Sequence, residues 1–206
     1  MRNILALAAL AMVMASCTHS SSHHCVSPLP AGVDIDSLAD CTVPAQFNVA
    51  DFNWTDSTLT MTVYNEDLYD AVDLNTLQSG DTIVYQGRSI VVAKVADTAD
   101  GLKTINDGIE QGGADLQAHE GGTYRGIQLD DHSVYTSLGK ATVPIANNLV
   151  VVDCGIEPDE PSDTIGTDAL SYLKQLKGGR DGFIELNTLV QIEHGKVTRI
   201  TRCWIP

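Results

Sequence analysis

Short runs of alternating apolar and polar residues dominate the chain from about residue 42 onward. The clearest run is 58–64, TLTMTVY, in which apolar residues alternate with threonines. A period of two places successive side chains on opposite faces, so this run predicts a β-strand with one face on a core. Two further runs, 82–85 and 89–95, flank the short segment 86–88, and we expect them to form a hairpin.

The glycine-rich middle segment, 97–126, contains short β-capable pieces separated by turn residues, and it predicts a meander with tight turns. These pieces run over 102–109, 114–118 and 123–129. Three more strands are expected after them, at 134–136, 141–145 and 148–153. The last contains an uninterrupted apolar run, LVVV, which is typical of a strand buried on both faces.

Helical periodicity is present in two places. A short helix is expected at 66–72, where Asn65 can act as the N-cap. A longer helix is expected at 168–177, because its leucines recur on one stripe, Thr167 can cap its start and Gly178 can end it.

The last two predicted strands, 188–192 and 196–204, form a hairpin that turns at His194 and Gly195. Strands therefore far outnumber helices in the predicted element order. We predict a mainly β fold, either a small antiparallel barrel or a sandwich, with one short C-terminal helix that covers an open end.

Residues 1–16 follow a different pattern from the rest of the chain. Arg2 precedes an apolar run at 4–14, and small residues stand directly before Cys17, which together indicate an export signal. The apolar run is shorter than the roughly twenty residues that a helix needs to cross a bilayer. We therefore expect no permanent transmembrane helix.

The segment Met14-Ala15-Ser16-Cys17 resembles the lipobox of bacterial lipoproteins. The resemblance implies that Cys17 is diacylated, becomes the new N-terminus and anchors the protein in a bacterial cell envelope. Thr18 follows it, whereas an aspartate at that position resembles the inner-membrane retention signal of enterobacterial lipoproteins, so the outer membrane is favoured. The alternative is an ordinary secretory signal that is cut near Ser16 and leaves Cys17 as a thiol.

Composition divides the chain into a signal peptide, 1–16, a tether, 17–30, and one β-rich domain, 31–206. The tether is rich in serine, histidine and proline and has no apolar period, so it is predicted to be disordered. The domain is long enough to bury a core of its own. Within it, 157–163 combines prolines with acids and predicts an acidic linker.

The chain carries 12 basic and 27 acidic residues, a net charge of −15. Nucleic acid is therefore a poor partner, because binding its phosphates requires a basic face. No lysine or arginine lies between residues 3 and 87, whereas bases gather in 174–202. We expect the two ends of the chain to lie side by side, with Lys196, Arg199 and Arg202 on the solvent face of the terminal hairpin. The alternative is an acidic face that steers a cation or a protein partner.

Four cysteines remain if Cys17 is acylated: Cys25, Cys41, Cys154 and Cys203. An even number of thiols in an oxidising envelope compartment is compatible with disulfides, and four cysteines allow three pairings. Our expected pairing is Cys25 with Cys41 and Cys154 with Cys203, the latter joining two predicted strands. The alternative is that all four are buried thiols that behave as small apolar residues.

Familiar catalytic motifs, such as the nucleophile elbow, the zinc-protease helix and the Ser-x-x-Lys pair, do not occur in the sequence. His119, His132 and His194 each stand among turn-forming residues, so we expect exposed turns there and predict no catalytic residue. The acids at 34–40 offer a short Asp-x-Asp but lack the glycine and the terminal glutamate of an EF-hand loop. No metal site and no cofactor are predicted.

These observations favour a membrane-anchored envelope lipoprotein that acts as a non-catalytic structural or partner-binding module, with an envelope protein or a glycan as partner. The alternatives are a carbohydrate- or calcium-binding module and a cryptic hydrolase. An exposed row of Trp54 and tyrosines would favour sugar binding, and a cleft with two convergent titratable groups would favour an enzyme. An open sheet edge or a large apolar patch would favour a protein partner.

Overall fold

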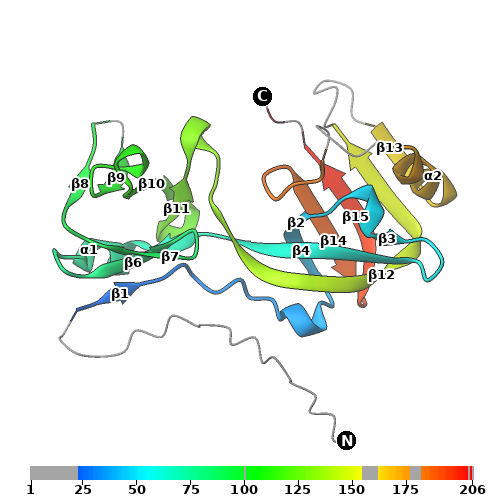
Figure 1. Ribbon diagram of the computed structural model, residues 1–206, viewed down its shortest axis with the longest axis horizontal. Coiled ribbons are helices and arrows are strands. Elements are labelled where there is room, and N and C mark those ends of the chain that lie inside the picture. The colour runs from blue at the N-terminus through cyan, green and yellow to red at the C-terminus, as the bar shows by residue number, and fades with distance from the viewer. Residues whose placement is uncertain (1–22, 100, 155–161, 177–181, 204, 206) are drawn as a thin grey trace, which may run out of the picture.

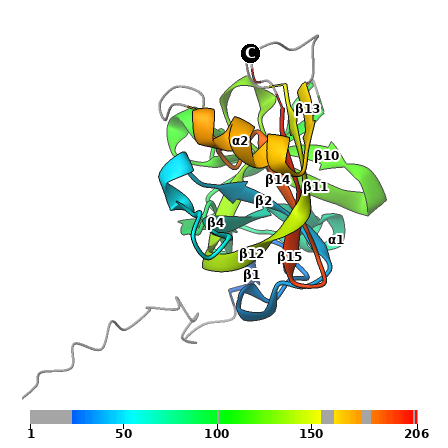
Figure 2. The ribbon, with the colours of Figure 1, turned by 90° about the vertical axis from the view of Figure 1, so that its right-hand side faces the viewer.

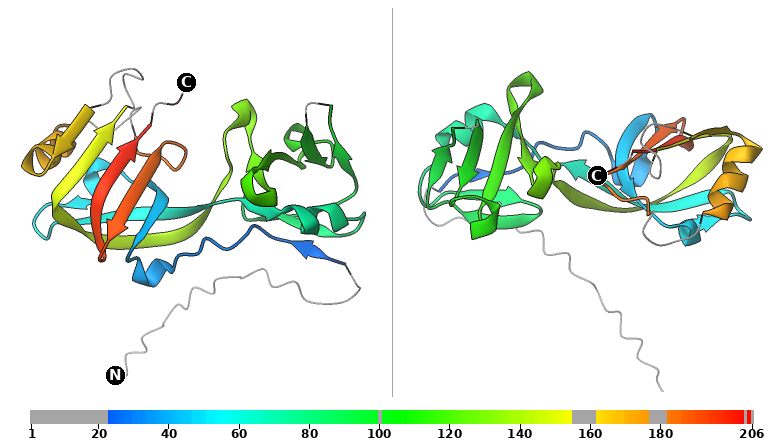
Figure 3. Two further views of the ribbon diagram at one scale, coloured as in Figure 1. Left: turned by 180° about the vertical axis from the view of Figure 1, so that it is seen from behind. Right: turned by 90° about the horizontal axis from the view of Figure 1, so that it is seen from above.

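The computed structural model describes residues 23–99, 101–154, 162–176, 182–203 and 205. Two β-rich lobes are joined by two long strands, β4 (Thr58–Glu66) and β12 (Tyr135–Asp153), which run side by side between them (Figure 1). The view from behind shows the same arrangement (Figure 3). We call the lobe that contains β1 and β5 to β11 the small lobe, and the lobe that contains β2 to β4 and β12 to β15 the large lobe.

The large lobe is a seven-stranded sheet in the order β13-β12-β15-β14-β2-β4-β3. Its other strands are β2 (Cys41–Gln46), β3 (Phe52–Asn53), β13 (Ser162–Ile165), β14 (Thr188–Glu193) and β15 (Lys196–Arg202). Strand β12 is antiparallel to β4 over its first half and parallel to β15 over its second half. These two pairings close β12, β15, β14, β2 and β4 into a ring of hydrogen-bonded strands.

The predicted alternation explains the core of the large lobe. On β4, Leu59, Met61 and Val63 are at most 1% exposed, whereas the threonines between them are half-buried. Apolar side chains of the other strands in the ring fill the same interior. Each such aliphatic side chain contributes about 1.5–3 kcal/mol when it is fully buried, so this interior is the main source of stability for the lobe.

The helix α2 (Thr167–Gln175) lies across the end of the large lobe that is remote from the small lobe (Figure 2). Its buried residues are Ala169 and Leu173, and Leu170 packs partly against the same core. The chain enters it through Gly166, which has a left-handed φ of +61° and acts as the N-cap in place of the predicted Thr167. A mainly β fold with one short helix near the C-terminus is thus confirmed.

The small lobe holds two sheets, ordered β1-β6-β7 and β5-β11-β10-β9-β8. The first contains β1 (Cys25–Val26), β6 (Thr82–Tyr85) and β7 (Arg88–Val91). The second contains β5 (Leu68–Asp70), β8 (Val95–Asp97), β9 (Leu102–Ile105), β10 (Ala114–His119) and β11 (Thr123–Ile127). The two sheets bury a second core that is separate from that of the large lobe.

Short helical turns link the strands. They are α1 (Ala71–Thr76) and the 3-10 turns Ile35–Ser37, Val49–Asp51, Ile109–Gln111, Glu120–Gly122 and Leu129–Asp131. The predicted hairpin forms between β6 and β7, and its two turn residues, Gln86 and Gly87, both have positive φ. Two left-handed residues in succession are what a two-residue hairpin turn requires.

Three element predictions were wrong. The strand expected at 89–95 ends at Val91 as β7, and Val95 begins β8 in the other sheet. The helix expected at 66–72 starts later, because 68–70 pairs with β11 as strand β5, and Asp70 rather than Asn65 caps α1. The three strands expected between 134 and 153 are one continuous strand, β12. A register shift between Ser137 and Gly139, whose φ is +133°, interrupts its pairing with β4, and a second shift between Ile145 and Val150 falls where the strand passes from β4 to β15.

The segment 23–30 was predicted as part of the disordered tether, but the structure orders it along the small lobe. Strand β1 runs parallel to β6, and the His24 N–H donates to Asp81 Oδ1 at 2.8 Å. These backbone hydrogen bonds need no apolar period, which is why composition did not reveal them. The predicted linker, 157–163, lies outside the described residues up to 161, and its last two residues begin β13.

Candidate functional site

The predicted site residues fall into two groups. Cys17 lies outside the described residues, so its acylation stays a prediction. Cys25 belongs to β1 in the small lobe, whereas Cys41 begins β2 in the large lobe (Figure 1).

The other two cysteines lie at one end of the large-lobe sheet. Cys154 and Cys203 directly follow the paired residues that end β12 and β15. The structure therefore brings Cys154 and Cys203 together at neighbouring strand ends and places the first pair on different sheets. It forms no disulfide among the four, so the pairings also stay predictions.

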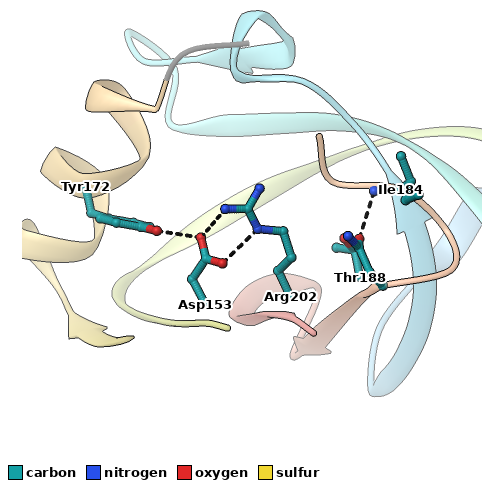
Figure 4. A network of polar contacts seen from close by, with 6 residues as sticks. Asp153, Tyr172, Ile184, Thr188 and Arg202 are labelled. Carbon is teal, nitrogen blue, oxygen red and sulfur yellow. Dashed lines mark hydrogen bonds and ion pairs between the residues drawn. The ribbon is translucent and has the colours of Figure 1, made fainter. Parts of the chain in front are cut away.

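The end of the large-lobe sheet contains a buried ion pair that the sequence analysis missed (Figure 4). Arg202 Nε and Nη2 donate to the two carboxylate oxygens of Asp153, at 2.8 and 2.6 Å, and both side chains are 1% exposed. The Tyr172 hydroxyl of α2 donates to the same carboxylate. Burial and this hydrogen bond raise the pKa of Tyr172 to about 12, so the phenol stays a donor at neutral pH.

Arg202 was predicted on the solvent face of the terminal hairpin, and this was wrong. Strand alternation contains the signal that would have placed it correctly, because Arg202 stands two residues after the buried Ile200 and so shares its inward face. Arg199, by contrast, is exposed as expected. The guanidinium also lies 4.7 Å from the ring centroid of Phe183, which adds a cation–π contact. We call the bonded side chains of Asp153, Arg202 and Tyr172 the brace.

The predicted contact between the two ends of the chain is present at the turn between β14 and β15. Strand β2 pairs with β14, and the His194 N–H donates to Asp40 Oδ1 at 2.8 Å. Shallow grooves border the segment 32–41 there. One groove lies between 40–42 and 191–194, and the next lies between this segment and 140–144. We call the surface formed by 32–41, 191–195 and 140–144 the groove surface.

The acidic side chains of the groove surface form hydrogen bonds with residues of the same surface. Asp34 accepts hydrogen bonds from the Asp36 N–H, at 3.0 Å, and from the Ser37 hydroxyl, at 2.9 Å, and the first of these holds its pKa below the usual range. Asp40 holds the His194 backbone as described above. Within the part of the chain that the structure describes, no three histidine, cysteine or acidic side chains are arranged to hold a metal ion.

One groove contains Asp40, Cys41 and His194, residue types that could support nucleophilic catalysis. Burial raises the pKa of the Cys41 thiol, and the nearby Asp40 raises it further, so the reactive thiolate is disfavoured. Catalytic cysteines have the opposite environment, one that lowers the thiol pKa. His194 lies 3.6 Å from Asp40 through Nδ1, and its side chain is 93% exposed. The arrangement is suited to surface contact rather than to attack on a substrate.

The other residues that the sequence analysis weighed lie as follows. His119 adjoins the turn between β10 and β11, and Asp130 and Asp131 both have positive φ in a turn, as expected. Trp54 is half-buried, stacked on Phe52 on one side with Lys174 over its ring. Its aromatic faces are therefore engaged within the large lobe.

The small lobe contains a buried carboxylate of its own. Asp67 is 0% exposed, its Oδ2 accepts the Gln86 N–H at 2.9 Å, and its Oδ1 has no hydrogen-bond partner among the described residues. Burial raises the pKa of this carboxyl above its usual range. The Thr136 hydroxyl lies near the carboxyl and partly offsets that rise in pKa. Thr136 Oγ1 itself has no hydrogen-bond partner among the described residues.

Comparison with protein-family models, with curated proteins and with solved structures found no match to this chain in any of the three. Among the described residues, no helix combines the length and the apolar character needed to cross a membrane.

Proposed function

We propose that this protein is a lipid-anchored module of a bacterial envelope and binds a protein partner through the groove surface. The anchor is supported by the export signal and by the lipobox resemblance at residues 14–17. The binding role is supported by one observation above the others: contiguous shallow grooves surround a projecting acidic segment, 32–41.

The charge of the groove surface favours a basic partner segment. Asp34, Asp36 and Asp40 are exposed on the segment and Glu193 on the adjoining hairpin, whereas Lys140 is the one lysine or arginine in the three segments that form this surface. Such an excess of one sign speeds the encounter with an oppositely charged surface and suppresses like-charged partners. Shallow and mostly polar grooves suit a flat macromolecular surface better than a small molecule, which prefers a deep apolar pocket.

The binding site can be tested by crosslinking in living cells. A photoreactive residue at Asp36, on the groove surface, should give one discrete crosslinked product. The matched control is Val72 of α1 in the small lobe, which is 71% exposed and should give none. Equal patterns at the two positions, or none at either, would contradict the proposed surface.

Charge reversal gives a second test of the same surface. Asp36→Lys should weaken the crosslink from a neighbouring position such as Ser37, because it removes attraction for a basic partner. Asp73→Lys on α1 makes the same change of charge in the small lobe and should leave the crosslink intact. Equal loss in both variants would indicate a general charge effect rather than a docking surface.

The anchor is tested by Cys17→Ala and cell fractionation. A diacyl group supplies the two hydrophobic chains that stable anchoring requires, so its loss should release the protein from washed membranes. Retention of the variant in the membrane fraction would contradict lipid anchoring through Cys17.

A further inference from the structure

Cys154 and Cys203 each follow directly after the last hydrogen-bonded pair of β12 and β15. Val152 pairs with Thr201 and Asp153 with Arg202 in this parallel ladder, and the next residue on each strand's chain is a cysteine. The Cys154 N–H donates to the Arg202 carbonyl at 2.8 Å, and this bond completes the Asp153–Arg202 pair, so each cysteine lies directly beyond the last paired position. Neighbouring strands lie about 4.7–4.9 Å apart, within the range of about 4.4–6.8 Å between the Cα atoms of bridged cysteines.

The two cysteine side chains also share a face of the sheet. Asp153 and Arg202 point inward and bond to each other, so the next residue on each strand points to the opposite face. Burial agrees with this alternation, since Asp153 and Arg202 are buried whereas Cys154 is half-buried and Cys203 is exposed. Register and facing therefore both favour a bond between the two sulfur atoms.

We propose that Cys154 and Cys203 form a disulfide by exchange with a low-molecular-weight disulfide such as oxidised glutathione. The exposed Cys203 thiolate attacks one glutathione sulfur and displaces the other as a thiolate. The Cys154 thiolate then attacks the Cys203 sulfur of the mixed disulfide and displaces the second glutathione thiolate. Two protein thiols are oxidised, one glutathione disulfide is reduced to two thiols, and the two protons pass to the displaced thiolates.

The bond would fasten the C-terminal strand at the point where its hydrogen-bonded ladder ends. It lies one residue beyond the buried Asp153–Arg202 pair, so it would hold β12 and β15 together across the brace. It would also close a loop of the chain that contains β13, α2, β14 and β15. A crosslink of this kind restricts the unfolded chain and raises the melting temperature.

Trypsin gives an unambiguous assay for this bond. Cys154 falls in the peptide 141–174 and Cys203 in the peptide 203–206, whereas Cys25 and Cys41 fall together in the peptide 3–88. The full chain carrying Cys17→Ser is incubated with oxidised and reduced glutathione under native conditions, quenched with acid, alkylated and digested without reductant. Mass spectrometry should then detect 141–174 linked to 203–206.

Matched variants separate this bond from other thiol chemistry. The linked peptide should persist in the Cys25→Ser/Cys41→Ser variant and disappear in Cys154→Ser and in Cys203→Ser. Oxidation should raise the melting temperature by roughly 5–10 °C wherever the linked peptide forms and leave the single variants unchanged. Circular dichroism of the reduced proteins checks that each variant is folded.

Two results would overturn the proposal. One is a folded protein in which Cys203 carries only glutathione and the linked peptide never forms. The other is a linked peptide that forms only after the chain is unfolded in guanidinium chloride, which would mean that the native register does not bring the two sulfur atoms together.

Discussion

The two lobes each bury a carboxylate, but they surround it differently. In the large lobe, Asp153 receives two hydrogen bonds from the buried guanidinium of Arg202 and a third from Tyr172. In the small lobe, Asp67 receives a backbone hydrogen bond from Gln86, and its second oxygen has no partner among the described residues. Both carboxylates are at most 5% exposed, so burial alone does not distinguish them.

The difference shows what a buried charge requires. Desolvation of a carboxylate costs several kcal/mol, and only a cation with good geometry and further donors offsets it. Asp153 has such partners, and the result is a brace that joins β12, β15 and α2. Asp67 bonds to no cation among the described residues, and burial raises its pKa instead. The same residue type therefore supports a rigid joint in one lobe and a proton-sensitive position in the other.

The largest expected effect comes from breaking the large-lobe pair. Arg202→Met removes the two hydrogen bonds that Asp153 accepts from the guanidinium and should lower the free energy of unfolding by about 3–5 kcal/mol. Urea denaturation followed by circular dichroism measures it. The double variant Asp153→Leu/Arg202→Met should lose less free energy of unfolding than Arg202→Met, because the double variant leaves no buried charge behind. A loss below about 1 kcal/mol in Arg202→Met would mean that the pair is not a brace.

A smaller loss in the free energy of unfolding is expected when Asp153 and Arg202 are kept and only the Tyr172 hydroxyl is removed. Tyr172→Phe deletes one hydroxyl that donates to the Asp153 carboxylate. A hydrogen bond to a charged group contributes about 1.5–3 kcal/mol, and the free energy of unfolding should fall by that amount. Tyr135→Phe, on β12 outside the brace, is the control. Equal losses in the two variants would show that the brace does not depend on Tyr172.

Neutralising the small-lobe carboxylate, Asp67, should raise the free energy of unfolding, whereas disrupting the Asp153 pair should lower it. Because the pKa of Asp67 is raised in the folded state, the folded protein binds the proton more tightly than the unfolded chain. The stability contributed by protonated Asp67 is complete below the unfolded pKa, near 3.8, and is lost as the pH rises through the folded pKa. Asp67→Asn should therefore stabilise the protein by about 1 kcal/mol at pH 7, since a neutral amide can donate toward Thr136 Oγ1.

The measurement is the difference in the free energy of unfolding between wild type and Asp67→Asn across pH 4 to 8. The advantage of the variant should shrink as the pH falls toward 4, because wild-type Asp67 then becomes neutral as well. Thr136→Val should move that change to higher pH, since the Thr136 hydroxyl lowers the Asp67 pKa. A difference that is constant with pH would show that Asp67 does not titrate in this range.

The smallest change in the free energy of unfolding is expected for an exposed ion pair. This pair shows what an ionic contact contributes without burial, for comparison with Asp153 and Asp67. Lys94 Nζ lies 2.6 Å from Asp107 Oδ1, and both side chains are about 60% exposed. Lys94→Gln should cost roughly 0.2–1 kcal/mol at low salt and nearly nothing at 1 M salt. A loss that does not change with salt would point to packing of the lysine stem instead of charge.

Much of the fold was predictable because strand alternation is local. The run at 58–64, the hairpin turn at Gln86 and Gly87, and the terminal hairpin all match the structure closely. Each of these depends on residues that are neighbours along the chain. The errors arose where pairing partners decide the outcome: 68–70 forms a strand because β11 lies beside it, and β12 stays continuous because β4 and β15 each pair with part of it.

The candidate site was less predictable for the same reason. The grooves arise where segments 32–41, 140–144 and 191–195 meet, and no local pattern indicates that these distant stretches share a surface. Arg202 and Asp153, 49 residues apart, each continue an alternating run, but only the register of β12 against β15 makes them partners. The same register ends both strands directly before a cysteine, Cys154 on one and Cys203 on the other, whereas the even cysteine count left three pairings open.

By itself, the sequence determined the mainly β class, the short C-terminal helix and the acidic charge, because period-two alternation, helical spacing and composition are properties of the chain alone. The tertiary structure decided which strands are neighbours, and therefore which charges are buried together, which cysteines follow the ends of paired strands and which loops form the groove surface. Alternation assigns residues to two faces of a strand. Only pairing with strands far along the chain determines what each face meets.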